Sequence, residues 1–106
     1  MNKKLLDSLL SYEGKGDYLA LATLIDSSGS SPRNAGAQML VYPDGSIEGT
    51  IGGGPSEAET IEKAKELMKK GENGRFKFEF TNEEIAAAGG ICGGEIIVFI
   101  ETIRSF

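Results

Sequence analysis

The sequence predicts a single compact domain of the layered α/β or α+β class, with a mixed sheet of about five strands and about three helices. Apolar runs of strand length alternate with segments of helical periodicity. Turn-forming residues, glycine above all, separate these segments. A chain of 106 residues with 40% hydrophobic content can bury one modest core, and no repeat or linker divides residues 1–106 into two domains.

The amino-terminal half is predicted to contain one helix and three strands. Leucines recur at helical spacing in residues 2–13, and two glycines close that segment. Residues 18–26 are a nearly continuous apolar run, which indicates a buried strand. After a polar loop over residues 27–36, strands are expected over 37–42 and 46–52, joined as a hairpin by the turn sequence PDG.

The carboxy-terminal half is predicted to contain two helices and two strands. Residues 56–70 are the clearest helix, with an apolar face that includes Ala58 and with charged residues pointing outward. The sequence RFKFEF at 75–80 alternates charged residues with phenylalanine, as in a strand with one buried face. A Thr-x-x-Glu capping box predicts a short helix over 82–88, and the apolar run at 95–103 indicates the last strand.

The charge and composition exclude several classes of protein. Acidic residues outnumber basic ones by 16 to 11, which gives a formal net charge of −5. Nucleic acids and anionic membranes both attract basic surfaces, so neither is an expected partner. No apolar run approaches the roughly 20 residues of a membrane span, and Asp7 and Ser8 interrupt any signal-peptide core. A soluble cytoplasmic protein is therefore expected.

The stretch GTIGGGPSEAE, residues 49–59, is the first candidate binding feature. Its triple glycine comes directly before the predicted helix, which Ser56 can cap, with Glu59 completing a capping box. If the helix begins one residue earlier, Pro55 takes the first-turn position that proline favours. The free N–H groups there lie at the positive end of a helix dipole and can hold an anion such as phosphate. The alternative is that the glycines only let a strand turn tightly into a helix. Glu57 and Glu59 already complement the helix dipole, and their charges weigh against a bound anion unless their side chains turn away.

Arg33 and Cys92 are the other candidates. Arg33 is the only charged residue of the loop 27–36, and a guanidinium binds phosphate or carboxylate through two hydrogen bonds; a solvated surface arginine is the alternative. Cys92 lies between two glycine pairs in GGICGG, an open loop that can favour a thiolate, whereas a lone cysteine is more often a small buried apolar residue. With one cysteine and no histidine, an internal disulfide is excluded and the commonest metal ligand is missing.

Three blocks of the sequence resemble the amino-terminal domain of the xanthine dehydrogenase accessory protein family, XdhC/CoxI. They are GSSPRNAGAQMLVYPDGSIEGTIGGG, EAETIEKA and GGICGGEIIVFIE, in this order, and the resemblance covers most of the chain from Leu19 to Glu101. The resemblance implies a maturation factor for molybdenum hydroxylases. Such proteins bind the molybdenum cofactor, a pterin with a phosphate or nucleotide and a dithiolene-bound metal, and assist its sulfuration and insertion. An accessory binding protein, or chaperone, is thus implied rather than an enzyme.

The same resemblance implies a site and partners. The cofactor would be bound cargo rather than a permanent group, and no catalytic residue is implied. The partners would be a molybdenum hydroxylase and either a cysteine desulfurase or a separate Rossmann-type accessory chain, and a homodimer is compatible with so small a domain. Three loops would surround the ligand, and their residues are Ser30, Ser31, Arg33, Gly52, Gly53, Gly54 and Cys92.

Two departures from the family pattern bear on these expectations. Many members carry a cysteine where this sequence has Pro55, and proline can neither ligate a metal nor carry sulfur. Full-length members also have a carboxy-terminal Rossmann-like domain, which residues 1–106 do not include. A non-catalytic interaction subunit, docking a Rossmann-type partner or the hydroxylase, is therefore the alternative function. Sulfur transfer through a persulfide on Cys92 is a third.

Overall fold

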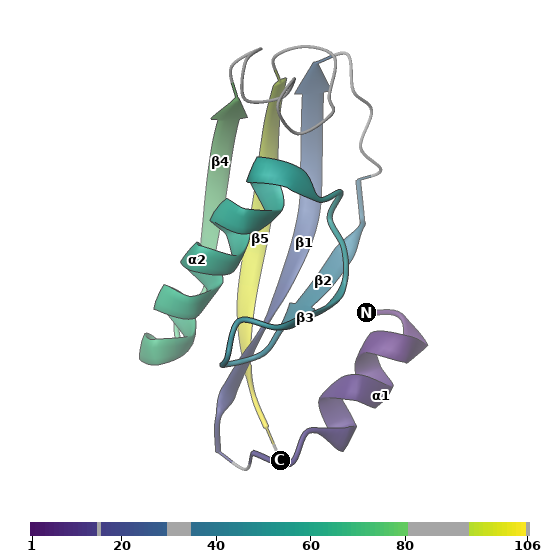
Figure 1. Ribbon diagram of the computed structural model, residues 1–106, viewed down its shortest axis with the longest axis vertical. Coiled ribbons are helices and arrows are strands. Elements are labelled where there is room, and N and C mark those ends of the chain that lie inside the picture. Colours follow the sequence, from purple (N-terminus) through teal and green to yellow (C-terminus); the bar gives the residue numbers. More distant parts are fainter. Residues whose placement is uncertain (15, 30–34, 81–93, 106) are drawn as a thin grey trace.

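A five-stranded sheet in the order β3-β2-β1-β5-β4 carries two helices (Figure 1). This computed structural model describes residues 1–14, 16–29, 35–80 and 94–105. In chain order the elements are α1 (Lys3–Ser11), β1 (Tyr18–Gly29), β2 (Gln38–Val41), β3 (Ile47–Gly49), α2 (Gly54–Lys70), β4 (Gly74–Phe80) and β5 (Gly94–Arg104). The predicted α+β class and the five strands are confirmed, while the helix expected over 82–88 lies outside the described residues.

All four strand pairings are antiparallel, so the expectation of a mixed sheet is wrong. The physical reason is the path of α2. This helix joins β3 to β4, which run in the same direction, as in a βαβ unit. These two strands lie at opposite edges of the sheet, with three antiparallel strands between them, so no two neighbours are parallel.

Strand β1 lies in the middle of the sheet and is buried on both faces. Ala20, Ala22 and Leu24 point into the core beneath α2, and the alternating Leu19 and Leu21 point into a second core beneath α1. A strand buried on both sides needs apolar residues at every position, which is why this segment is a continuous apolar run. The predicted buried strand is confirmed, and its pairing with β5 extends it to Gly29.

The two helices cover opposite faces of the sheet. Helix α1 docks through Leu5 and Leu9, and the side chain of Asn2 caps it by accepting a hydrogen bond from the Leu5 amide at 2.9 Å. Helix α2 crosses the other face (Figure 1). Within the described residues, neither helix is long and apolar enough to cross a membrane.

The buried stripe of α2 confirms Ala64 and Met68 of the predicted apolar face and differs from it at the start of the helix. Ser56, Thr60, Ala64 and Met68 are buried, whereas Ala58 is exposed. The hydroxyl of Thr60 donates to the carbonyl of Ser56 at 2.7 Å, so its burial leaves no unsatisfied donor. Small side chains at this end of α2 allow it to lie close to the sheet, which places the glycine run beside the core.

Candidate functional site

The glycine run adopts a backbone conformation that other residues rarely reach. Gly52, Gly53 and Gly54 have φ angles of 127°, 74° and 73°, and Gly53 combines its positive φ with a ψ of −176°. Residues with a side chain are strained in this region, which is almost restricted to glycine. The backbone turn between β3 and α2 is therefore sufficient reason for the glycines, as the structural alternative predicts.

Helix α2 begins two residues earlier than predicted. Its N-cap is Gly53, which provides no side-chain cap, and Pro55 lies in the first turn. The predicted capping box of Ser56 and Glu59 is therefore wrong. The Ser56 hydroxyl instead donates to the Gly53 carbonyl at 3.1 Å and is buried.

The carboxylate of Glu57 closes the glycine run from the helix side. Its Oε2 atom accepts a hydrogen bond from the Gly53 amide at 2.8 Å and another from the Thr50 hydroxyl at 2.5 Å. The Thr50 oxygen in turn accepts a hydrogen bond from the Gly52 amide at 2.9 Å. The two amides are thus bonded within the chain, one to a carboxylate and one to a hydroxyl.

The amide at the start of α2 could bind an anion, but the Glu57 carboxylate of the same chain already occupies it. A carboxylate in the first turn of a helix is stabilised by the helix dipole and by the amide that it accepts from. A phosphate cannot bind the Gly53 amide while Glu57 occupies it. The described part of the predicted site therefore does not fit a phosphate at this amide in the present conformation.

Gly53 nevertheless offers access to the backbone from outside. A Cβ atom added at Gly53 would meet no heavy atom of the described residues within 4 Å, so this part of the chain leaves the space above its Cα open. Ile51, two residues earlier, is 1% exposed and belongs to the core beneath α2. The loop is thus anchored at Ile51 and open at Gly53, which suits the approach of a flat or bulky ligand.

The other predicted site residues, Ser30, Ser31, Arg33 and Cys92, lie outside the described residues. The strand ends that lead to them are described. Gly29 at the end of β1 is the register partner of Gly94 at the start of β5, and Phe80 at the end of β4 pairs with the same Gly94. The two segments that carry these four residues are therefore attached at one end of the sheet. The first turn of α2 lies toward this same end of the molecule's long axis (Figure 1).

Two residues of this loop were missed or misinterpreted from the sequence. The sequence pattern gives Thr50 no role, and it presents Glu57 as a charge that complements the helix dipole and repels an anion, not as a hydrogen-bond acceptor for this loop. The spacing does contain a signal, because an acidic residue four positions after an N-cap amide can fold back onto it. Among the described residues, no group of three acidic or cysteine side chains is placed to hold a metal ion.

A second concave surface lies between α1 and the β2–β3 hairpin. This open groove, about 940 Å³ in volume, has Tyr12, Tyr42, Lys3 and Glu48 among its lining residues. The tyrosine rings are 5.7 Å apart between centroids. The described residues of the predicted site, Gly52, Gly53 and Gly54, do not line this groove, so the structure does not join it to the glycine run.

Comparisons with known proteins agree with one another. The model of the XdhC and CoxI family matches residues 14–79. The chain is 43% identical over 81 residues to the uncharacterised protein YqeB of Escherichia coli (strain K12), a match that covers 76% of this chain and 15% of YqeB. A solved structure described as a xanthine dehydrogenase from Bacillus halodurans superposes with a TM-score of 0.76 at 27% identity, over 95% of this chain and 30% of that one. The chain thus spans a minor part of the length of both relatives.

Proposed function

The chain belongs to the XdhC and CoxI family, and from that membership we propose that it assists the maturation of a molybdenum hydroxylase of the xanthine dehydrogenase type by binding the molybdenum cofactor. The cofactor is cargo that the chain holds and passes on, either for sulfuration or for insertion. The name of the Bacillus halodurans neighbour, a xanthine dehydrogenase, supports the choice of hydroxylase.

One observation carries the proposal: the pairing of Gly29 with Gly94. It attaches the segment that begins at Ser30 and the segment that ends with Cys92 to neighbouring strands at one end of the sheet. A pocket built from both segments needs no long excursion of the chain. Ligand sites are commonly formed by loops that a rigid sheet holds together at one end.

The role of each proposed site residue follows from the geometry of the glycine run. Arg33 pairs with the phosphate of the pterin, because the Gly53 amide is already bonded to Glu57. Ser30 and Ser31 supply hydroxyl donors, and the open face of Gly53 lets the pterin lie against the backbone. Cys92 is the thiol available to the metal or sulfur end of the cofactor.

The first test is binding of molybdopterin, released from a purified molybdoenzyme, to the full chain with and without Arg33→Ala. Loss of a charge-assisted hydrogen-bonded contact costs about 1.5–3 kcal/mol, so we expect affinity measured by pterin fluorescence to fall about ten- to hundredfold. Arg104→Ala is the matched control, because Arg104 is exposed at the other end of β5 from Gly94. Equal affinity in wild type and Arg33→Ala would remove Arg33 from the site.

The second test concerns the internal carboxylate. We expect Glu57→Gln to raise the affinity for inorganic phosphate several-fold, about three- to tenfold, because the neutral amide no longer repels an anion near the Gly53 amide. Glu59→Gln, an exposed position on the same helix, is the control and should change little. Phosphate binding can be followed by calorimetry. If Glu57→Gln and wild type bind alike, anions do not compete with Glu57 at this loop.

A second candidate function, docking without cofactor, is favoured by one observation. Leu6 and Leu10 lie one turn apart on α1 and are 42% and 58% exposed. An apolar ridge of this kind is typical of interaction surfaces. A hydroxylase that binds the cofactor-free chain as tightly as the loaded chain would favour this function over delivery of a cofactor.

A further inference from the structure

Strand β4 presents a regular, open edge to its surroundings. It is the last strand of the sheet, and no other strand among the described residues pairs with its outer side. Its seven residues pair with β5 without interruption from Gly74 to Phe80, and they contain no proline. Open edges of this length are templates for pairing with another strand unless the chain protects them.

The opposite edge is less suited to pairing. Strand β3 has three residues and ends at Gly49, which has a φ of 79°. Its short length limits the number of backbone hydrogen bonds that a further strand can make. The two edges therefore differ, and only β4 offers a long regular one.

The side chains of β4 are complementary to the same strand in the reverse direction. Arg75, Lys77 and Glu79 are exposed on one face, and Phe76 and Phe78 pack on the other face against the core beneath α2. An antiparallel pair with its two-fold axis at Lys77 would place each Arg75 opposite Glu79 of the partner subunit. It would also place each phenylalanine opposite a phenylalanine. Opposite charges and aromatic pairs across strands both stabilise antiparallel pairing.

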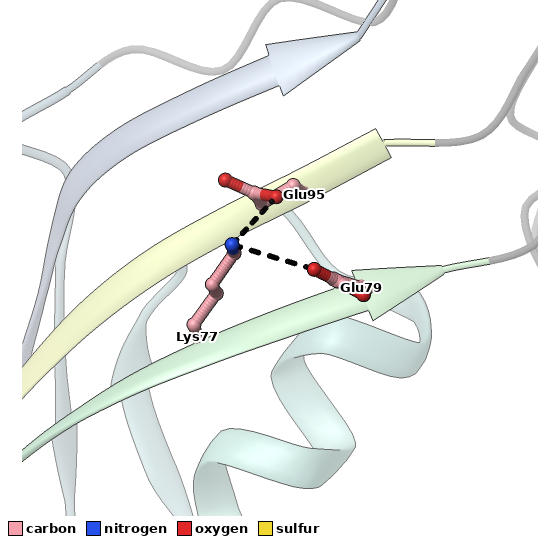
Figure 2. Close-up of polar contacts among 3 residues, drawn as sticks. All are labelled: Lys77, Glu79 and Glu95. Atoms are coloured by element: carbon pink, nitrogen blue, oxygen red, sulfur yellow. Dashed lines mark ion pairs between the residues drawn. The ribbon is translucent and has the colours of Figure 1, made fainter.

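Lys77 at the centre of this register does not block the edge. Its Nζ atom lies 3.2 Å from Glu95 on β5 and 3.4 Å from Glu79. Figure 2 shows the amine held between the two carboxylates, with its chain directed toward β5 rather than outward. The hydrogen bonds that the Lys77 amine donates to Glu95 first, and then to Glu79, raise the pKa of Lys77, so it stays protonated and paired. The charges of Arg75, Lys77, Glu79 and Glu95 sum to zero.

We propose that a second copy of this chain docks on β4, forming an antiparallel β4–β4 pair about a two-fold axis at Lys77. The two sheets then form one continuous sheet of ten strands, five from each copy. The interface is isologous, so each charged pair occurs twice. This assembly is independent of cofactor binding, because β4 carries none of the residues assigned to the ligand.

Charge reversal and charge exchange test the register. Arg75→Glu and Glu79→Arg each replace two attractive pairs with two repulsive ones, and we expect each to raise the dimer dissociation constant by about tenfold or more. The double variant R75E/E79R restores opposite charges at both positions and should return the constant to within about threefold of wild type. Lys69→Glu, an exposed reversal on α2, is the control. Sedimentation equilibrium on the full chain over a dilution series measures the constant, and thermal unfolding verifies that each variant is folded.

Two results would overturn the proposal. One is a wild-type chain that remains monomeric at every concentration measured. The other is a dimer that the single reversals weaken no more than Lys69→Glu does, or that the double exchange fails to restore. The first result would show that the chain does not dimerise, and the second would show that it dimerises through another interface.

Discussion

Ile51→Ala is expected to lower the free energy of unfolding by about 2–5 kcal/mol, through lost burial and the cavity left behind. Ile51 is 1% exposed and packs in the core beneath α2. It also stands directly before the glycine run, so its removal frees the loop at its only fully buried anchor among residues 49–54. We therefore expect weaker cofactor binding in addition to lower stability.

The control for this prediction is Ile25→Ala. The same atoms are removed, but Ile25 is 42% exposed, at the point where the register of β1 and β5 shifts. Exposed substitutions of this kind change stability by about 0.5 kcal/mol or less. Urea unfolding followed by circular dichroism measures both. Similar losses in the two variants would mean that Ile51 does not anchor the loop.

Gly49→Ala is expected to lower the free energy of unfolding more than Gly53→Ala does, although both glycines have a positive φ. The φ angle of 79° strains any alanine by about 1–3 kcal/mol. A Cβ atom there would also lie 2.7 Å from the backbone carbonyl oxygen of Gln38 on β2. That oxygen cannot move without disturbing the pairing of β2 with β3, so overpacking adds about 1–3 kcal/mol.

Gly53→Ala introduces the backbone strain without the close contact of a Cβ atom. Its φ of 74° is close to that of Gly49, but no atom of the described residues occupies the space that a Cβ atom needs. The loss in unfolding free energy should therefore be limited to the backbone strain of about 1–3 kcal/mol. Differential scanning calorimetry of both variants gives the comparison. A Gly53→Ala loss as large as that of Gly49→Ala would contradict the assignment of the extra cost to the Gln38 contact.

The sequence predicted the local elements well, because their patterns are local. The apolar run of β1, the hairpin after it and the long helix α2 were all found, with ends shifted by a few residues. The predicted apolar face of α2 is confirmed at Ala64 and Met68. It is wrong at the start of the helix, because Ser56 and Thr60 look polar in the sequence. Their hydroxyls bond to backbone carbonyls of the same helix, and this makes burial possible.

The sheet order could not be predicted from these patterns. The pairing of β1 with β5 joins residues more than 60 positions apart, and no spacing rule specifies it. The candidate site could be predicted only where it depends on local sequence. The glycine run has a local conformational requirement that its composition reveals, whereas the contact of Glu57 with the Gly53 amide depends on how the helix begins.

The position of β5 between β1 and β4 has a consequence for how the domain is made. β1 leaves the ribosome before β2, β3 and β4, yet its neighbour β5 is the last of the five described strands to be synthesised. Until Arg104 has emerged, one side of β1 and the inner side of β4 have no strand to pair with. The nascent sheet must therefore lack its strand between β1 and β4, and folding of the sheet is completed only after synthesis has passed β5.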